Sequence, residues 1–370
     1  MRRVVKVSRI RIIITIIVVV LTTLLTGCTG KEPNEIAYVV ALGIDSTDDD
    51  NYKITIQYAN TTQISGGASE SGGKAGSEIV DNVTIEAPNI YAGVGLANNI
   101  VSKSFSMSHA KLIVFSKEIA EKGVKDMIET LVRSEEIRPD VFIAVANTTA
   151  NDYLTSVNPE MEVNPAQYYQ LIYQKNQLVG IPDGQLREFF TGLYTDNYDS
   201  ILPVAGVIDG SGGNSQNDDK GQSKDSQNEG SEGSSESLDS FESKSSNEKD
   251  ENEKEKDAEK NTSKYEYDIK NYVGGETTIE KKNKAEAIGA AVFEKDKMVG
   301  ELGEVETEIC KILKGDYTYS YLTYYNNDTP DIPITVKTTQ QKKPKYKIDT
   351  DKKTVDIELY IESDLYSLPA

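Results

Sequence analysis

A long polar stretch divides the parts of this chain that can form a core into two separate pieces. Between Asp209 and Lys260 almost no residue is apolar except Leu238 and Phe241. Such a composition cannot bury enough surface to offset the entropy of ordering, so we expect residues 209–260 to be disordered. Sequences typical of strands lie on both sides of it, so we expect an acidic insertion within a domain. The entropic cost of closing a loop grows only slowly with its length, so a long insertion destabilises a domain only slightly more than a short one.

The first 28 residues have the layout of a secretory signal. An apolar run over Ile12–Leu25 follows a basic head and is shorter than the ~20 residues that span a bilayer. The order Leu25-Thr26-Gly27-Cys28 resembles the lipobox of bacterial lipoproteins. The resemblance implies that residues 1–27 are a signal peptide and that Cys28 carries the acyl chains, palmitate among them. The alternative is an uncleaved anchor with an incidental cysteine.

Charge and cysteine content exclude several classes of function. The 370 residues carry a net charge of −20, which disfavours nucleic acid and broad adhesion to anionic lipid. Only Cys28 and Cys310 are present, so no disulfide framework is expected. One histidine and no tryptophan leave little material for metal or triad chemistry. We expect a protein that is not an enzyme and holds no cofactor.

The residues before the polar stretch alternate between strand and helix patterns. Ile36–Ile44 is an apolar run of strand length, and Tyr52–Tyr58 alternates with the period of a half-buried strand. Two strands, a helix, a strand, a helix, a strand and further helices are expected, which fits an α+β domain over residues 28–200. One helix is expected between Ser116 and Pro139. Expected helix starts, marked by residues that cap N-termini, are Ser116, Thr149 and Asn164.

The residues around the insertion predict a middle domain over 201–313. Ile201–Ile208 and Ala287–Phe293 are apolar strands, Met298–Gly300 starts a return strand, and Glu301–Leu313 predicts a helix.

Alternating residues from Tyr317 to Ile361 predict a run of antiparallel strands, a β-rich C-terminal domain over 314–370. The predicted fold class is α+β, with three domains of mixed or antiparallel sheets, packed helices and the disordered acidic insertion.

The sequence contains two residues that could be reactive, His109 and Cys310. His109 follows two serines, but neighbours on a strand point to opposite faces, so we interpret it as a hydrogen-bonded residue at a strand edge. Cys310 lies on the predicted last helix among glutamates, which disfavour a thiolate, so we interpret it as a small buried hydrophobe.

Two candidate ligand sites were also weighed. The carboxylates at positions 45, 48, 49 and 50 could bind Ca²⁺ weakly, but they lack the glycine and terminal glutamate of an EF-hand loop. A solvated hairpin turn is the preferred interpretation. Residues 68–75 approach a phosphate-binding loop, yet Ala75 replaces the hydroxyl that would hold Mg²⁺.

Tyrosine is strongly preferred over phenylalanine, with 21 against seven. The group at positions 317, 319, 321, 324 and 325 could form a recognition surface, because tyrosine combines contact area with a polar tip. Equally, these rings could face a sheet partner. The sequence leaves both readings open.

Several stretches, in order, are similar to the Ger(x)C lipoproteins, the C subunits of spore germinant receptors. The stretches that carry the resemblance are Glu35–Asp45, Ser108–Val114, Ala120–Val124, Arg133–Arg138, Ala290–Phe293 and Lys297–Leu302. The long insertion departs from the family, and the C-terminal domain is shorter than the family's third domain. Either the sequence is incomplete or that domain is degenerate.

The resemblance implies a non-catalytic lipoprotein on the outer face of the spore inner membrane, anchored through Cys28. It would assemble with the integral membrane A and B subunits into a nutrient germinant receptor. The alternative is an extracytoplasmic solute-binding lipoprotein acting on its own, which the lack of repeated βα units disfavours. A lipid-anchored hydrolase is disfavoured by the single histidine.

Overall fold

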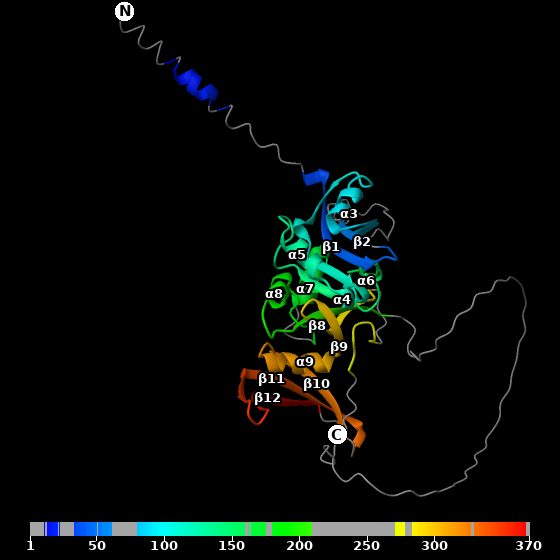
Figure 1. The fold of residues 1–370 in the computed structure, drawn as a ribbon, viewed down its shortest axis with the longest axis vertical. Helices are drawn as coiled ribbons and strands as arrows, with labels where there is room; N and C mark the ends of the chain where they lie inside the picture. The colour runs from blue at the N-terminus through cyan, green and yellow to red at the C-terminus, as the bar shows by residue number, and fades with distance from the viewer. Residues whose placement is uncertain are drawn as a thin grey trace, which may run out of the picture.

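The described part of this computed structural model contains two β-sheets of unequal size (Figure 1). One helix lies between the sheets, and the other described helices of the globular part pack on the larger sheet. The structure describes residues 11, 13–20, 22, 33–49, 51–60, 80–159, 162, 164–174, 180–208, 271–277, 283–326 and 329–367. No helix in these ranges is long and apolar enough to cross a bilayer.

Within the described residues the larger sheet has nine strands, and its centre is parallel. The order is β3-β2-β1-β5-β6-β7-β8-β9, with the short β4 paired to β1. β1, β5, β6 and β7 run parallel, whereas β2 and β3 at one edge and β8 and β9 at the other are antiparallel. The strands are β1 (Ile36–Ser46), β2 (Tyr52–Ala59), β3 (Val80–Ala87), β4 (Ser104–Ser106), β5 (Leu112–Ser116), β6 (Phe142–Ala146), β7 (Ser200–Val207), β8 (Ala285–Glu294) and β9 (Lys297–Leu302).

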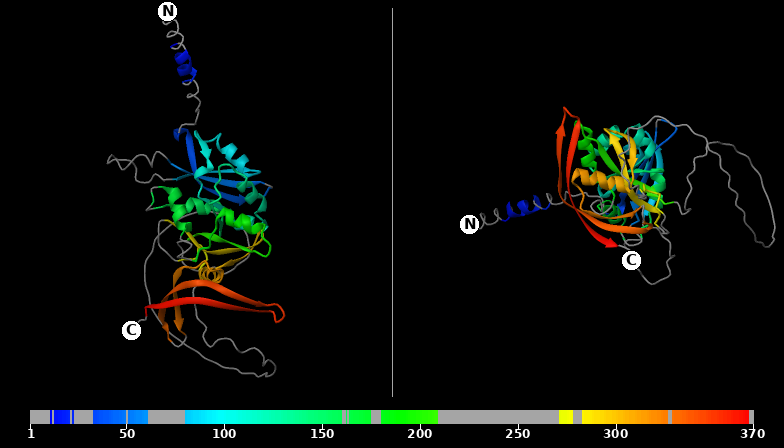
Figure 2. Two further views of the ribbon diagram at one scale, coloured as in Figure 1. Left: turned by 90° about the vertical axis from the view of Figure 1, so that its left-hand side faces the viewer. Right: turned by 90° about the horizontal axis from the view of Figure 1, so that it is seen from below.

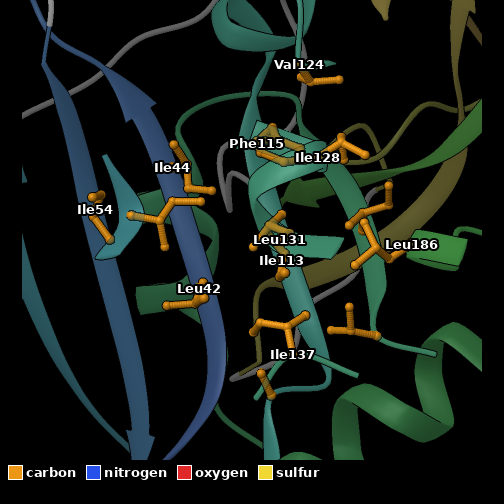
Figure 3. Close-up of a cluster of buried hydrophobic side chains, with 14 of the residues drawn as sticks. Leu42, Ile44, Ile54, Ile113, Phe115, Val124, Ile128, Leu131, Ile137 and Leu186 are labelled. Atoms are coloured by element: carbon orange, nitrogen blue, oxygen red, sulfur yellow. The ribbon is translucent and has the colours of Figure 1, made fainter. Parts of the chain in front are cut away.

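Helices cover both faces of this sheet. One face packs against α3 (Ile90–Ala97), α4 (Lys117–Lys122), α5 (Lys125–Val132) and α8 (Leu186–Leu193). Figure 3 shows part of this core, with Ile128 and Leu131 of α5 and Leu186 of α8 among the buried side chains. The other face packs against α6 (Ala150–Ser156) and α7 (Pro165–Gln174). Strands β5 and β6 are buried throughout, which explains their unbroken apolar sequences.

The predicted helix starts are confirmed. The Ser116 and Thr149 side chains accept hydrogen bonds from the backbone amides of Ile119 and Asp152. Asn164 Oδ1 accepts from the amide of Ala166 at 3.0 Å, beside Pro165.

Two predictions for the first 200 residues are wrong. The edge strand β3 was not expected, although it pairs along its whole length with β2. The single helix expected after Ser116 is divided into α4 and α5 by Gly123, whose φ of 122° lies in a region that side chains disfavour.

The smaller sheet is antiparallel, as predicted, in the order β10-β11-β12. Its strands are β10 (Tyr319–Asn326), β11 (Thr329–Asp349) and β12 (Thr354–Ser367). The two short strands expected near Ile334 and Ile348 are parts of the single long β11. Pro344 lies where the pairing of β11 with β12 shifts register, between Lys342 and Lys345. Regular pairing is interrupted there, so the backbone N–H that proline lacks is not needed for a hydrogen bond to the neighbouring strand.

The mixed α+β class is confirmed. The domain boundary predicted at residue 200 falls at the start of β7. β7 pairs with β6, which precedes this boundary, so strands from both sides of the boundary belong to one sheet. The division into three domains stays a prediction. The insertion 209–260 lies outside the described residues, between the neighbouring antiparallel strands β7 and β8.

Candidate functional site at the junction of the two sheets

Helix α9 (Glu304–Lys314) lies between the two sheets, as Figure 2 shows from two further sides. It packs against β8 and β9 of the larger sheet and against β11 of the smaller one. Its first turn is held by the Gly303 amide, which donates to Glu306 Oε2 at 3.0 Å. Its end is set by Gly315, with φ of 75°. The helix therefore joins the two sheets.

Glu308 points from α9 toward the smaller sheet and is only 4% exposed. Its carboxylate accepts a hydrogen bond from Ser320 Oγ of β10 at 2.8 Å, and that hydroxyl is 2.5 Å from the Tyr317 hydroxyl. Burial raises the pKa of Glu308 to about 7, although the Ser320 hydrogen bond opposes the shift. The carboxyl group therefore keeps its proton to a higher pH than an exposed glutamate does.

Lys311 follows one turn later and reaches toward the larger sheet. Its Nζ donates to the carbonyl oxygen of Ile181 at 3.1 Å, and the residue is 5% exposed. Burial lowers the pKa of Lys311 to about 8, while the nearby carboxylate of Glu308 opposes the shift. Neither residue is predicted as a site residue from the sequence. Their spacing could have indicated that they are buried. On a helix, positions 308 and 311 lie on the same face as Thr307 and Ile312, which are buried.

A crevice of about 500 Å³ opens beside Lys311. Its walls carry charges of both signs: Asp183, Glu188, Asp316, Lys311 and Lys314. Burial raises the pKa of Asp183, and Lys314 Nζ lies 5.4 Å from the ring centre of Tyr198. Mixed charge around a small volume suits a zwitterionic or dipolar small molecule better than a simple anion. The polar groups that line the crevice are carboxylates, lysines and hydroxyls, which can form hydrogen bonds and ion pairs with a ligand.

The smaller sheet exposes apolar side chains on the face that α9 partly covers. The Tyr346 hydroxyl donates to the Leu313 carbonyl of α9, and Tyr346 pairs across the sheet with Ile357, so both lie on this face. We call the exposed residues here the β12 face: Ile348, Val355, Ile357 and Ile361, which are 68%, 56%, 45% and 41% exposed. Contiguous exposed apolar residues of this kind mark interaction surfaces.

The candidate residues from the sequence do not come together. Cys28 lies outside the described residues. His109 forms a hydrogen bond, as predicted, but it ends a short 3-10 turn (Met107–His109) and does not lie on a strand, so the predicted position is wrong. Its Nδ1 is 3.1 Å from Ser108 Oγ. Its exposed ring packs edge-on against the ring of Tyr38, with the two ring centres 4.8 Å apart.

Asp45 is buried, which corrects its assignment to a solvated turn. Its carboxylate accepts hydrogen bonds from the amides of Ala150 and Asn151, at 2.6 and 3.0 Å, and so fixes the start of α6. Burial raises the pKa of Asp45, and these two hydrogen bonds oppose the shift. Among the described residues no cluster of His, Cys, Asp and Glu could hold a metal ion.

Cys310 is half-buried on α9, so the expected core position is only partly correct. The tyrosines separate into different roles. Tyr317 is buried at the junction, whereas Tyr321 is exposed and packs edge-on against Tyr366 at 5.1 Å. A larger group, buried between α6, α7 and the sheet, comprises Tyr153, Tyr168, Tyr169 and Tyr173.

Comparison with known proteins decides the family. Residues 30–207 match the family described as "Spore germination protein N-terminal domain", and residues 288–369 match "Spore germination B3/ GerAC like, C-terminal". The chain belongs to the GerAC-like, or Ger(x)C, family of spore germination proteins. The resemblance seen in the sequence is thereby confirmed, and the two matches stand on either side of the polar insertion.

Curated relatives of this Ger(x)C chain are distant. Spore germination protein KC of Bacillus subtilis (strain 168) is 26% identical over 174 residues, 43% of this chain and 42% of that protein. Putative spore germination protein YfkR of the same organism is 28% identical over 145 residues, 39% and 37% of the two chains. Spore germination protein GerQC of Bacillus cereus is 27% identical over 104 residues, 28% and 29%. The chain thus spans less than half the length of these relatives, and no solved structure matches it.

Proposed function

We propose that this Ger(x)C chain is the lipid-anchored, non-catalytic subunit of a nutrient germinant receptor, needed for its assembly or signalling. Acylated Cys28 would hold it at the outer face of the spore inner membrane, beside the integral membrane A and B subunits. The carrying observation is the pair of family matches in order, with a lipobox-like sequence directly before the first. The exposed β12 face supports a role in assembly.

Affinity capture from spore membranes tests this function. A tagged full-length chain, solubilised in mild detergent, should recover two multi-span proteins. Cys28→Ala should abolish incorporation of radiolabelled palmitate and leave an unprocessed or released protein. Recovery of the acylated chain with no polytopic partner would defeat the receptor proposal, and palmitate entering Cys28→Ala would defeat the anchor assignment.

The mixed-charge crevice favours one second candidate, a solute-binding lipoprotein acting on its own. Calorimetry of the purified chain against amino acids, sugars and nucleosides separates the two. Tight binding by this chain alone, lost in Lys314→Ala, would favour direct capture of a solute. No heat of binding would leave the assembly role as the better account.

A further inference from the structure

The outer side of α3 carries two exposed aliphatic residues one turn apart. The helix buries Ile90, Val94 and Ala97 against the sheet, whereas Leu96 is 46% and Ile100 is 66% exposed. The turn after α3 keeps helical hydrogen bonding, since the Ile100 amide donates to the Ala97 carbonyl at 3.0 Å. Residues four apart on a helix lie on the same side, so the two side chains form one ridge, which we call the α3 ridge.

This ridge lies at the end of the molecule where β1 begins. Asn98 Oδ1 accepts a hydrogen bond from the Phe105 amide at 2.7 Å, which fixes the turn onto β4. β4 pairs in parallel with the start of β1, with Ser104 opposite Ile36. Figure 1 shows this turn beside the start of β1, and the smaller sheet at the opposite end of the molecule.

The chain length before β1 limits how far this end can be from an acylated Cys28. Eight residue steps separate Cys28 from Ile36, and a fully extended chain covers at most about 3.6 Å per step, or about 29 Å. The α3 ridge is therefore within reach of any bilayer that holds Cys28, whereas the β12 face lies at the far end.

The charge pattern at this end fits a membrane surface. The chain has 60 Asp and Glu residues, yet none occurs between Glu86 and Glu118. Lys103 and His109 fall in that acid-free stretch. On neighbouring elements, Glu35 precedes β1, and Glu135 and Glu136 line a hollow with Gly95, Asn98 and the cation Arg133. Glu136 Oε2 accepts a hydrogen bond from the Met107 amide at 2.7 Å. Exposed aliphatic residues in a segment that carries lysine and no carboxylate are what an interface with anionic lipid favours.

We infer that the α3 ridge rests in the headgroup region of the bilayer and sets the orientation of the tethered protein, with the smaller sheet directed away from the membrane. This inference depends on the proposed acylation of Cys28. It adds a second contact, made by Leu96 and Ile100, to the covalent anchor.

Fluorescence quenching on the full-length acylated chain tests the orientation. In a Cys310→Ser background, Ile100→Cys is labelled with an environment-sensitive dye, and Ile348→Cys, of matched 68% exposure at the far end, is the control. The protein is reconstituted without partner subunits in phosphatidylglycerol–phosphatidylethanolamine vesicles that contain nitroxide lipids. Quenching at position 100 should exceed quenching at position 348 by at least about twofold, and Leu96→Asp should reduce it.

Radiolabelled palmitate is counted on the same preparation, which separates the two proposals. Equal quenching at both positions in palmitate-bearing protein would overturn the ridge contact and leave the anchor standing. Protein without palmitate and without quenching would overturn both. Quenching at position 100 in protein without palmitate would support the ridge and overturn the anchor.

Discussion

The two sheets of this protein differ in how completely they are covered. The larger sheet has helices on both faces, and Leu42, Ile44 and Ile113 in it are inaccessible to solvent. The smaller sheet has α9 over part of one face, and every apolar residue of the β12 face is more than two-fifths exposed. A sheet in water is stabilised by burying at least one face. The larger sheet meets this condition within the chain, whereas the smaller sheet meets it only in part.

The largest effect should come from the same substitution made in each sheet. Ile44→Ala in β1 should lower the free energy of unfolding by about 3 kcal/mol, because it removes fully buried methyl groups and leaves a cavity. Ile357→Ala on the β12 face should cost less than about 1 kcal/mol. Urea unfolding followed by circular dichroism measures both. Equal losses would show that the smaller sheet is packed in solution.

A close backbone approach in the larger sheet gives the next test. A Cβ added to Gly206 of β7 would lie 2.0 Å from the Gly274 carbonyl carbon, where the chain returns against the sheet. Gly206→Ala should therefore destabilise the protein by about 2 kcal/mol, since backbone must move. Gly300→Ala on β9, whose Cβ would meet nothing within 4 Å, is the control. If both variants unfold at the same urea concentration, residues 271–277 do not pack there.

The sequence predicted the larger sheet better than the junction. Strands β1, β2, β5 and β6 could be recognised because burial on one or both faces leaves a clear apolar pattern. The edge strand β3 was missed because its burial is partial and irregular. The division between α4 and α5 depends on one glycine conformation, which helix periodicity does not record.

The candidate site was largely invisible in the sequence for a physical reason. Glu308 and Lys311 read as surface charges in a helix, and their burial comes from two sheets that meet only in the folded chain. Likewise Asp45 looked like one of several turn carboxylates, whereas its partners on α6 are more than 100 residues away. The family motifs, in contrast, were readable because they are local strings.

The pH dependence of stability should isolate the junction from both sheets. The pKa of Glu308 is about 7 in the folded protein and near 4.5 in the unfolded chain. Between these values the unfolded chain releases a proton that the folded protein keeps, so this group makes stability fall as pH rises through that window. Glu308→Gln should make this fall shallower and gain about 1–2 kcal/mol of stability relative to the parent from pH 4.5 to pH 7. Asp45 and Asp183, whose pKa values burial also raises, should keep their part of the fall.

The exposed Glu294→Gln in β8 serves as the control for this titration, with urea unfolding measured at several pH values. It should keep the parent's pH profile. A profile for Glu308→Gln that is parallel to that of the parent would mean that the carboxylate is hydrated and that α9 does not seal the junction.

The smallest effect on stability, and the sharpest on association, is expected on the β12 face. Ile357→Thr keeps a β-branched side chain at a position 45% exposed, so the free energy of unfolding should change by less than about 0.5 kcal/mol. Loss of an apolar contact surface should nevertheless weaken capture of the polytopic partners from spore membranes, through the parts of those partners that project from the bilayer, because exposed apolar area is what a partner would bury. Val299→Thr on β9, 60% exposed outside that face, should leave the capture unchanged. If both variants capture partners as well as the parent, the incomplete cover of the smaller sheet does not serve assembly, and the comparison between the sheets would describe stability alone.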